Sequence, residues 1–362
     1  MRELLPDLDT LTAAGHSVGR AVVVSVWGSA PRPAGACLLA TADGRLAGSV
    51  SGGCVESAVT EEVAAAIRAG TGKLISYGVT DERAWEVGLA CGGTIQVLVE
   101  PSIPAEVLAA AREAAGSVVG TVLPAAGAGS TAGGTRVAVS ETGEYRGPAW
   151  LAAVRDPAVE ALRRETSTTA SVRGPDGGEV RIFLEVFPRR PTLVIFGGVH
   201  IAVALIPLAK RLGYRTVVAD GRQSFVTRER FPEADTLLVA WPEEAFRQVG
   251  LGPATYVCVL SHDPKFDEPA LELALRSPAP YIGAIGSKKT QLARRERLLA
   301  QGFSATDLKR LYGPIGLDLG GRGPAETALA ILAEMTMVRY GGGGRPQAPA
   351  QGYTGLSSAV GP

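Results

Sequence analysis

Two cysteines of this 362-residue chain are candidates for chemistry because each stands beside a pair of glycines. Cys54 follows the segment GSVSGG and precedes a predicted helix, and Cys91 precedes Gly-Gly and a predicted strand. A thiol at a helix start is a better nucleophile and sulfur or metal ligand, since the helix dipole favours the thiolate. The alternative, a small thiol buried as a hydrophobic group, stays open. The neighbouring candidate contacts are Ser51, Gly52, Gly53, Gly92 and Gly93.

A second group of candidates lies in the turn FGGVHIA, residues 196–202. Compared with the dinucleotide-binding pattern G-x-G-x-x-G/A, Val199 replaces the second glycine. Its Cβ opposes a close approach of pyrophosphate to the backbone, so the turn favours a nucleotide-type ligand but not an ordinary NAD(P) arrangement. A glycine-rich turn without a ligand is the alternative. The candidate contacts are Gly197, Gly198, His200 and, at the end of the next predicted strand, Asp220.

Two further loops follow predicted strands in the same half of the chain. His262 and Asp263 are placed to bind a ligand or transfer a proton, since imidazole titrates near neutral pH. A solvated turn explains them equally well. Gly286, Ser287 and Lys288 open a predicted helix, where a serine cap, a lysine and free backbone N–H groups favour an anion.

The segment 313–326, GPIGLDLGGRGPAE, holds five glycines within eleven residues. Such a backbone can fold tightly around a ligand. Arg322 adds a donor able to bind phosphate through two hydrogen bonds. The candidate contacts in this segment are Gly316, Gly320, Gly321 and Arg322.

Alternating strand and helix patterns place the last three groups in one domain, residues 191–340, after the break PRRP at 188–191. Nearly continuous apolar strands between helices predict a parallel sheet covered on both faces, with ligands beyond the carboxyl ends of the strands. The predicted strands are Thr192–Phe196, Arg215–Ala219, Thr236–Ala240, Thr255–Leu260 and Tyr281–Ile285.

The first half of the chain has a different pattern. After a lead-in over residues 1–14, short strands and a helix at Val55–Ala69 predict an α+β module over residues 15–101. We interpret residues 102–190 as an extension or linker region belonging to this first domain, and residues 341–362, rich in Gly and Pro, as a flexible tail. The fold class is therefore α/β, with an α+β domain followed by a Rossmann-like parallel-sheet domain.

Composition excludes several classes of function. Lys+Arg and Asp+Glu both count 36, so the chain lacks the basic excess of a general nucleic-acid or membrane-surface binder. We expect no metal site, since the four cysteines form no CxxC pair, and Cys37 and Cys258 lie in apolar strands. Without a secretory signal or an apolar stretch of about 20 residues, the expected location is the cytoplasm.

The motifs together resemble those of the XdhC/CoxI family of xanthine dehydrogenase accessory proteins. The resemblance rests on WGSAPRPAG (27–35), GSVSGGCVE (48–56) and EVGLACGG (86–93), followed in order by 196–202, 261–264, 281–289 and 313–326. It covers roughly residues 15–101 and 188–340. Val199 departs from the glycine usual in the family.

The resemblance implies a factor that binds the molybdenum cofactor, as molybdopterin or its dinucleotide form. It implies help with sulfuration of the cofactor and its insertion into a molybdenum hydroxylase apoenzyme of the xanthine dehydrogenase type. Cys54 and Cys91 become candidates for contact with the cofactor or the transferred sulfur. A cysteine desulfurase is an implied partner, and a homodimer is the expected assembly.

Two enzymatic functions are the alternatives. The predicted sheet allows an NAD(P)-binding oxidoreductase, although Val199 opposes it. A phosphoryl- or nucleotidyl-transfer enzyme lacks support, since the chain has no Walker-A lysine motif. The chain also lacks the grouped cysteines of iron–sulfur clusters, which argues against a role as the large catalytic component of a xanthine dehydrogenase.

Overall fold

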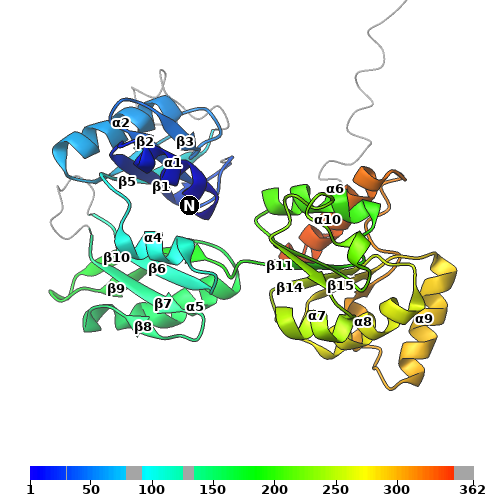
Figure 1. Cartoon of the computed structure of the whole chain (residues 1–362). Helices are drawn as coiled ribbons and strands as arrows, with labels where there is room; N and C mark the ends of the chain where they lie inside the picture. Colours follow the sequence, from blue (N-terminus) through cyan, green and yellow to red (C-terminus); the bar gives the residue numbers. More distant parts are fainter. Residues whose placement is uncertain (30, 79–91, 125–133, 346–362) are drawn as a thin grey trace, which may run out of the picture. The chain divides into compact units, whose positions relative to one another are not determined.

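The computed structural model describes residues 1–29, 31–78, 92–124 and 134–345 of the chain. The chain divides into two compact units, unit 1 (Met1–Arg189) and unit 2 (Arg190–Pro362), shown in Figure 1. The boundary falls inside the PRRP segment.

The first sheet of unit 1 is antiparallel, with the strand order β3-β2-β1-β5-β4. Its strands are β1 (Val18–Trp27), β2 (Cys37–Thr41), β3 (Leu46–Gly48), β4 (Lys73–Tyr77) and β5 (Thr94–Glu100). One face is covered by α2 (Glu56–Ala69), which ends at Gly70 in the left-handed conformation. Val55, Val59 and Val63 recur every fourth residue and are fully buried, so the apolar face of the helix packs on the sheet.

Residues 102–190 form a second antiparallel sheet in the same unit, with the order β8-β7-β6-β10-β9. Its strands are β6 (Ser117–Val122), β7 (Arg136–Ser140), β8 (Tyr145–Arg146), β9 (Thr168–Arg173) and β10 (Glu179–Phe187). The helices η2 (Ala149–Val154) and α5 (Arg155–Arg163) pack on it. The N-terminal helices η1 (Arg2–Leu4) and α1 (Leu5–Ala13) share a core with α4 (Ala105–Arg112), β2 and β6.

A buried ion cluster joins the two sheets of unit 1. Arg20 of β1 is 0% exposed, and its Nε donates to Glu100 of β5 at 2.5 Å. Its Nη1 lies 3.0 Å from Oε2 of Glu185 in β10, and Arg136 of β7 also pairs with Glu100. Buried charges of this kind are tolerated only when they are paired, so the cluster requires both sheets to be in place.

Unit 2 is built on a six-stranded parallel sheet in the order β13-β12-β11-β14-β15-β16. Its strands are β11 (Thr192–Phe196), β12 (Arg215–Asp220), β13 (Thr236–Val239), β14 (Thr255–Val259), β15 (Tyr281–Ala284) and β16 (Leu311–Tyr312). The strand order reverses between β11 and β14, which is the point where doubly wound sheets bind their ligands.

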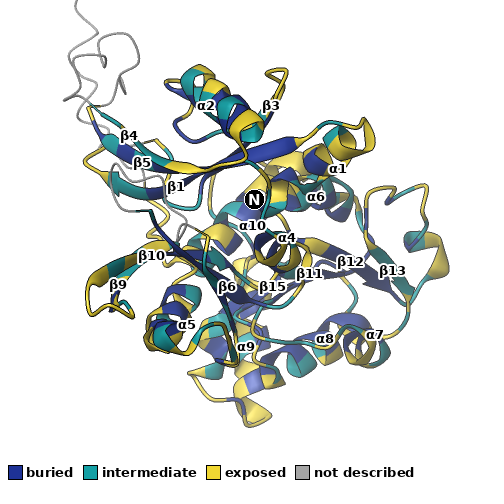
Figure 2. Ribbon diagram, turned by 90° about the vertical axis from the view of Figure 1, so that its left-hand side faces the viewer, coloured by how far each residue is buried: buried dark blue, intermediate teal, exposed yellow. Residues whose placement is uncertain are grey.

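Helices cover both faces of this sheet. One face carries α6 (His200–Arg211) and α10 (Pro324–Tyr340), and the other carries α7 (Pro242–Val249), α8 (Pro264–Arg276) and α9 (Lys288–Ala300). The strands are therefore buried on both sides, as Figure 2 shows. Short helices η3 (Gln223–Phe225) and η4 (Asp307–Arg310) complete the unit. The predicted α/β class is confirmed. Among the described residues, no helix has the length and apolar character needed to cross a membrane.

Candidate functional site

The loop that carries Cys54 is organised around the carboxylate of Glu56, the first residue of α2. Seven donors converge on its two oxygens at 2.6–3.2 Å: the hydroxyls of Ser49 and Ser51 and the backbone N–H groups of Val50, Ser51, Gly52, Gly53 and Val55. Backbone N–H groups can point inward together because Gly52 and Gly53 adopt φ values of 82° and 118°. A carboxylate of the chain itself therefore fills this anion-binding turn.

The electrostatics of the loop follow from these bonds. Partial burial pushes the pKa of Glu56 upward, but the hydrogen bonds from Ser49, Ser51 and the loop backbone outweigh it and lower the pKa to about 2. Cys54 itself is exposed, and its backbone N–H donates to Ser51 Oγ at 3.0 Å. It lies two residues before α2, so the thiol is presented outward from a fixed loop.

The loop Trp27–Gly35 lies between the two glycine-rich segments of unit 1. A Cβ on Gly52 would lie 3.6 Å from Cβ of Pro31, and a Cβ on Gly93 would collide with the carbonyl oxygen of Ser29. The glycines that adjoin both cysteines therefore contact the same loop. Cys91 lies outside the described residues; Gly92, its neighbour, is exposed with φ of 75°.

In unit 2, the predicted nucleotide turn and Asp220 do come together. The backbone N–H of Gly198 donates to Asp220 Oδ2 at 3.0 Å. Arg222 holds the same carboxylate through Nε and Nη2 at 2.9 and 2.8 Å and through its backbone N–H at 3.0 Å. Burial pushes the pKa of Asp220 upward, but these bonds outweigh it and leave the pKa below its ordinary value. Each oxygen thus accepts two N–H groups, while Val199 precedes α6 and His200 is exposed.

The loop after β14 is tied to a buried ion pair. Ser261 donates to Asp267, whose carboxylate lies 3.5 Å from Arg294. Burial raises the pKa of Asp267 to about 6, against the lowering effects of the Ser261 hydrogen bond and the Arg294 charge. Of the predicted residues, Asp263 caps α8 by accepting the N–H of Lys265 at 3.0 Å, and His262 is exposed.

The loop after β15 opens α9 as expected for a capped helix. Ser287 caps the helix by accepting the N–H of Thr290 at 3.2 Å, and Lys288 is exposed in the first turn. Gly286 has a φ of 137°. This leaves an exposed lysine at a helix start, an arrangement suited to an anion.

Helix packing explains part of the glycine-rich segment 313–326. Gly316 has φ of 93°, and a Cβ there would lie 3.2 Å from Ala330 of α10. Glu326 accepts the backbone N–H groups of Arg322 and Gly323 at 3.0 and 2.8 Å, which caps α10. Gly321 lies against Glu326, whereas Gly320 has open space around it. Arg322 is exposed.

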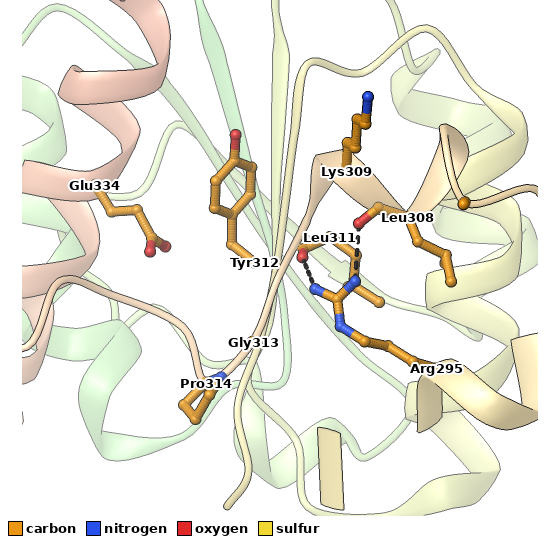
Figure 3. Close-up of a pocket in the computed structure, with 9 residues that line it drawn as sticks. Arg295, Leu308, Lys309, Leu311, Tyr312, Gly313, Pro314 and Glu334 are labelled. Carbon is orange, nitrogen blue, oxygen red and sulfur yellow. Dashed lines mark hydrogen bonds between the residues drawn. The ribbon is translucent and has the colours of Figure 1, made fainter. Parts of the chain in front are cut away.

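A pocket of about 420 Å³ lies beside β16 at the edge of the sheet (Figure 3). Arg295 forms one side by donating to the carbonyl groups of Leu308 and Leu311. Glu334 of α10, on the other side, accepts from Tyr281 Oη at 2.7 Å and from the backbone N–H of Gly316 at 2.9 Å. None of the predicted contact residues lines this pocket, which is therefore separate from the loops described above.

Sequence reasoning missed Glu56, Arg222 and Asp267 as organising residues. An acid at the first turn of a helix after a glycine-rich loop was a usable signal for Glu56. The spacing Asp-x-Arg at the end of β12 was one for Arg222, because the two side chains can pair across the turn. No local pattern marks Asp267, whose ion-pair partner Arg294 lies in a different helix. Within the described ranges, no group of three or more His, Cys, Asp or Glu side chains could hold a metal ion.

The fold and these loops define a two-unit α/β protein with a doubly wound C-terminal sheet and an exposed glycine-loop cysteine in its N-terminal unit. The model of the XdhC and CoxI family matches residues 11–78, and that of the XdhC Rossmann domain matches residues 193–335. The chain belongs to the XdhC/CoxI family, as its motifs predicted.

Similar proteins extend over nearly the whole chain. A protein of Bacillus subtilis (strain 168), described as a probable component of xanthine dehydrogenase, is 28% identical over 340 residues, 92% of this chain and 96% of that protein. The molybdenum cofactor insertion chaperone PaoD from Escherichia coli (strain K12) is 27% identical over 329 residues, 90% of this chain and 85% of that protein. A crystal structure described as a xanthine dehydrogenase from Bacillus halodurans superposes with a TM-score of 0.72 at 25% identity, covering 97% of this chain and 98% of the other.

Proposed function

We propose that this protein binds the molybdenum cofactor and supports its sulfuration and its insertion into a molybdenum hydroxylase of the xanthine dehydrogenase type. The observation that carries the proposal is the exposed Cys54 thiol on a loop held by seven hydrogen bonds to Glu56. Thiolates are soft ligands suited to molybdenum and to sulfur exchange. The name of the E. coli relative supports the same role.

In this proposal the cofactor is cargo, and the residues of the chain hold it without forming a metal cage. Cys54, with Cys91, contacts the cofactor or the sulfur that a partner cysteine desulfurase supplies. Exposed cationic groups of unit 2, Lys288 and Arg322, bind the phosphate of the pterin. His262 and Asp263 are the candidates for proton transfer. The client is the hydroxylase apoenzyme, and the working form is a cytoplasmic homodimer.

The alternative, an NAD(P)-binding oxidoreductase, has one observation in its favour, the strand order of the sheet. The state of Asp220 opposes it. Both oxygens of this carboxylate already accept two N–H groups, and the residue is 1% exposed. A ribose diol would have to displace Arg222 or Gly198 before it could bind there.

The proposal is tested by mass spectrometry of the ligand that co-purifies with the full chain from a molybdenum-replete host. We expect a pterin phosphate with molybdenum in the wild type and less of it in Cys54→Ala and Cys91→Ala. Cys258→Ala is the control, because it removes a thiol that is 0% exposed. Absence of any pterin from the wild type, or equal retention in all three variants, would overturn the proposal.

A further inference from the structure

Four planar side chains gather beyond the carboxyl ends of β12 and β13, where no function has been assigned above. Trp241 follows β13 and is 56% exposed, although its indole is the largest apolar side chain on that edge. Its ring centroid lies 4.7 Å from that of Phe266 in α8. The guanidinium carbon of Arg222, after β12, lies 3.7 Å from the ring centroid of Phe225 and 5.9 Å from that of Phe266. Phe266 therefore links the indole to the guanidinium.

The plane of Arg222 is fixed by its partners. Nε and Nη2 pair with the two oxygens of Asp220, and one face of the guanidinium rests on Phe225. The side chain nevertheless remains 39% exposed. Its hydrogen-bonding edge is thus engaged while part of its delocalised surface stays accessible, and Asp220 balances its charge. Such a group stacks on aromatic rings better than it binds a free phosphate.

The position of this group relates it to the first turn of the sheet. A Cβ on Gly198 would collide with the carbonyl oxygen of Phe225, so the turn and the segment after β12 are in direct contact. Gly198 also donates to Asp220, the residue that orients Arg222. A ligand lying along the carboxyl edge at this turn would reach the planar group without leaving the surface of unit 2.

We propose that Arg222, Phe225, Trp241 and Phe266 form a stacking site for the heteroaromatic base of a nucleotide. The argument selects a base because the site offers flat aromatic and guanidinium surfaces, whereas the carboxylate that would bind a ribose diol is saturated. Base–aromatic stacking is worth roughly a tenfold change in affinity for each aromatic group removed. The inference rests on the proposed function in one respect: it assigns the dinucleotide form, a base joined through diphosphate to molybdopterin, as the cargo.

The test uses plain nucleotides, so it does not depend on molybdenum or on pterin. The full chain is titrated with CMP, GMP and AMP, and with ribose 5-phosphate, which has the sugar and phosphate but no base. Calorimetry gives the affinity, and saturation-transfer NMR reports which ligand protons contact the protein. We expect at least one nucleotide to bind about tenfold more tightly than ribose 5-phosphate, with saturation transfer strongest at the base protons.

Variants locate the site. Trp241→Ala should weaken the nucleotide about tenfold and leave ribose 5-phosphate unchanged, and Trp241→Phe should restore much of the loss. Tyr340→Ala is the matched control, since Tyr340 is 65% exposed at the end of α10. The proposal is overturned if no nucleotide binds at millimolar concentration, if all ligands bind equally, or if Trp241→Ala binds like the wild type. It is also overturned if Trp241→Ala converts an oligomer into a monomer in sedimentation without changing nucleotide affinity, because Trp241 would then serve self-association. A failure here leaves the co-purification test of the proposed function standing.

Discussion

The Oε2 atom of Glu56 accepts the backbone N–H of Gly53 at 2.8 Å, so the first residue of α2 holds the residue that precedes Cys54. The same carboxylate is bonded to most of the loop, and the loop conformation therefore depends on one side chain. Glu56 is a positioning residue, since it acts on the exposed thiol only through the backbone.

Glu56→Gln should destabilise the protein, because a carboxamide replaces one acceptor oxygen by an N–H2 group that faces other donors. We expect a loss of about 1–3 kcal/mol in the free energy of unfolding at pH 6. The folded-state pKa of about 2 lies below the ordinary 4.5, so the stabilisation by the carboxylate is present above pH 4.5 and disappears as the pH falls toward 2. Urea unfolding at pH 6 and pH 3 should therefore show a smaller difference between variant and wild type at pH 3.

The control for this prediction is Glu61→Gln, which changes an exposed glutamate on the same helix. It should leave the free energy of unfolding within about 0.5 kcal/mol of the wild type. A difference between Glu56→Gln and wild type that stays constant from pH 6 to pH 3 would contradict the assigned pKa.

The described thiols should differ in reactivity. Cys54 is exposed, whereas Cys37 and Cys258 are buried, and burial raises the pKa of both buried thiols. Iodoacetamide should therefore alkylate Cys54 in the native protein and reach Cys37 and Cys258 only in urea. Peptide mass mapping at increasing times gives the order, with Cys54→Ser as the control for assignment. Alkylation of Cys258 at the rate of Cys54 in native protein would refute the burial described for β14.

The ion cluster between the sheets of unit 1 predicts a large loss on removal of its central cation. Arg20→Met leaves Glu185 without its partner and weakens the neutralisation of Glu100, so unfolding should become easier by about 3–5 kcal/mol. Arg146→Met is the matched control, because Arg146 pairs with Glu144 at the surface and its side chain is 78% exposed; its effect should stay below about 1 kcal/mol. Urea unfolding measures both. Similar small losses in the two variants would show that the cluster does not hold the sheets together.

Asp267 predicts a pH dependence of the opposite sign to that of Glu56. Its folded-state pKa of about 6 exceeds the ordinary 3.8, so the stabilisation is complete below pH 3.8 and is lost as the pH rises through 6. Relative to Asp267→Asn, the wild type should lose about 3 kcal/mol at most between pH 4 and pH 7. Ser261, His262, Asp263 and Arg294 surround the carboxyl group and are retained in both proteins.

Asp318→Asn, at an exposed carboxylate of the same unit, serves as the control and should show no such change. The measurement is the free energy of unfolding at half-unit steps of pH. A stability difference between wild type and Asp267→Asn that rises with pH would reverse the sign and reject the assignment.

The sequence alone was sufficient for the fold class, the family and most element boundaries. Apolar strands alternating with helices predict a parallel sheet because both patterns depend on residues close together in the chain. Val55, Val59 and Val63 mark α2 for the same reason, and Ser287 predicts the start of α9 through a hydrogen bond three residues long.

Only the tertiary structure decided which groups are free to bind. Asp220 has the right place for a ribose, yet Arg222 and Gly198 saturate it, and part of the glycine-rich segment 313–326 packs against α10. Arg20 and Glu185 are 165 residues apart in the chain and meet only when two sheets stack. Long-range pairing depends on how whole sheets and helices pack, and no local spacing encodes it. The exposed Cys54 satisfied both levels, since its motif identified it and its loop, held by Glu56, presents it.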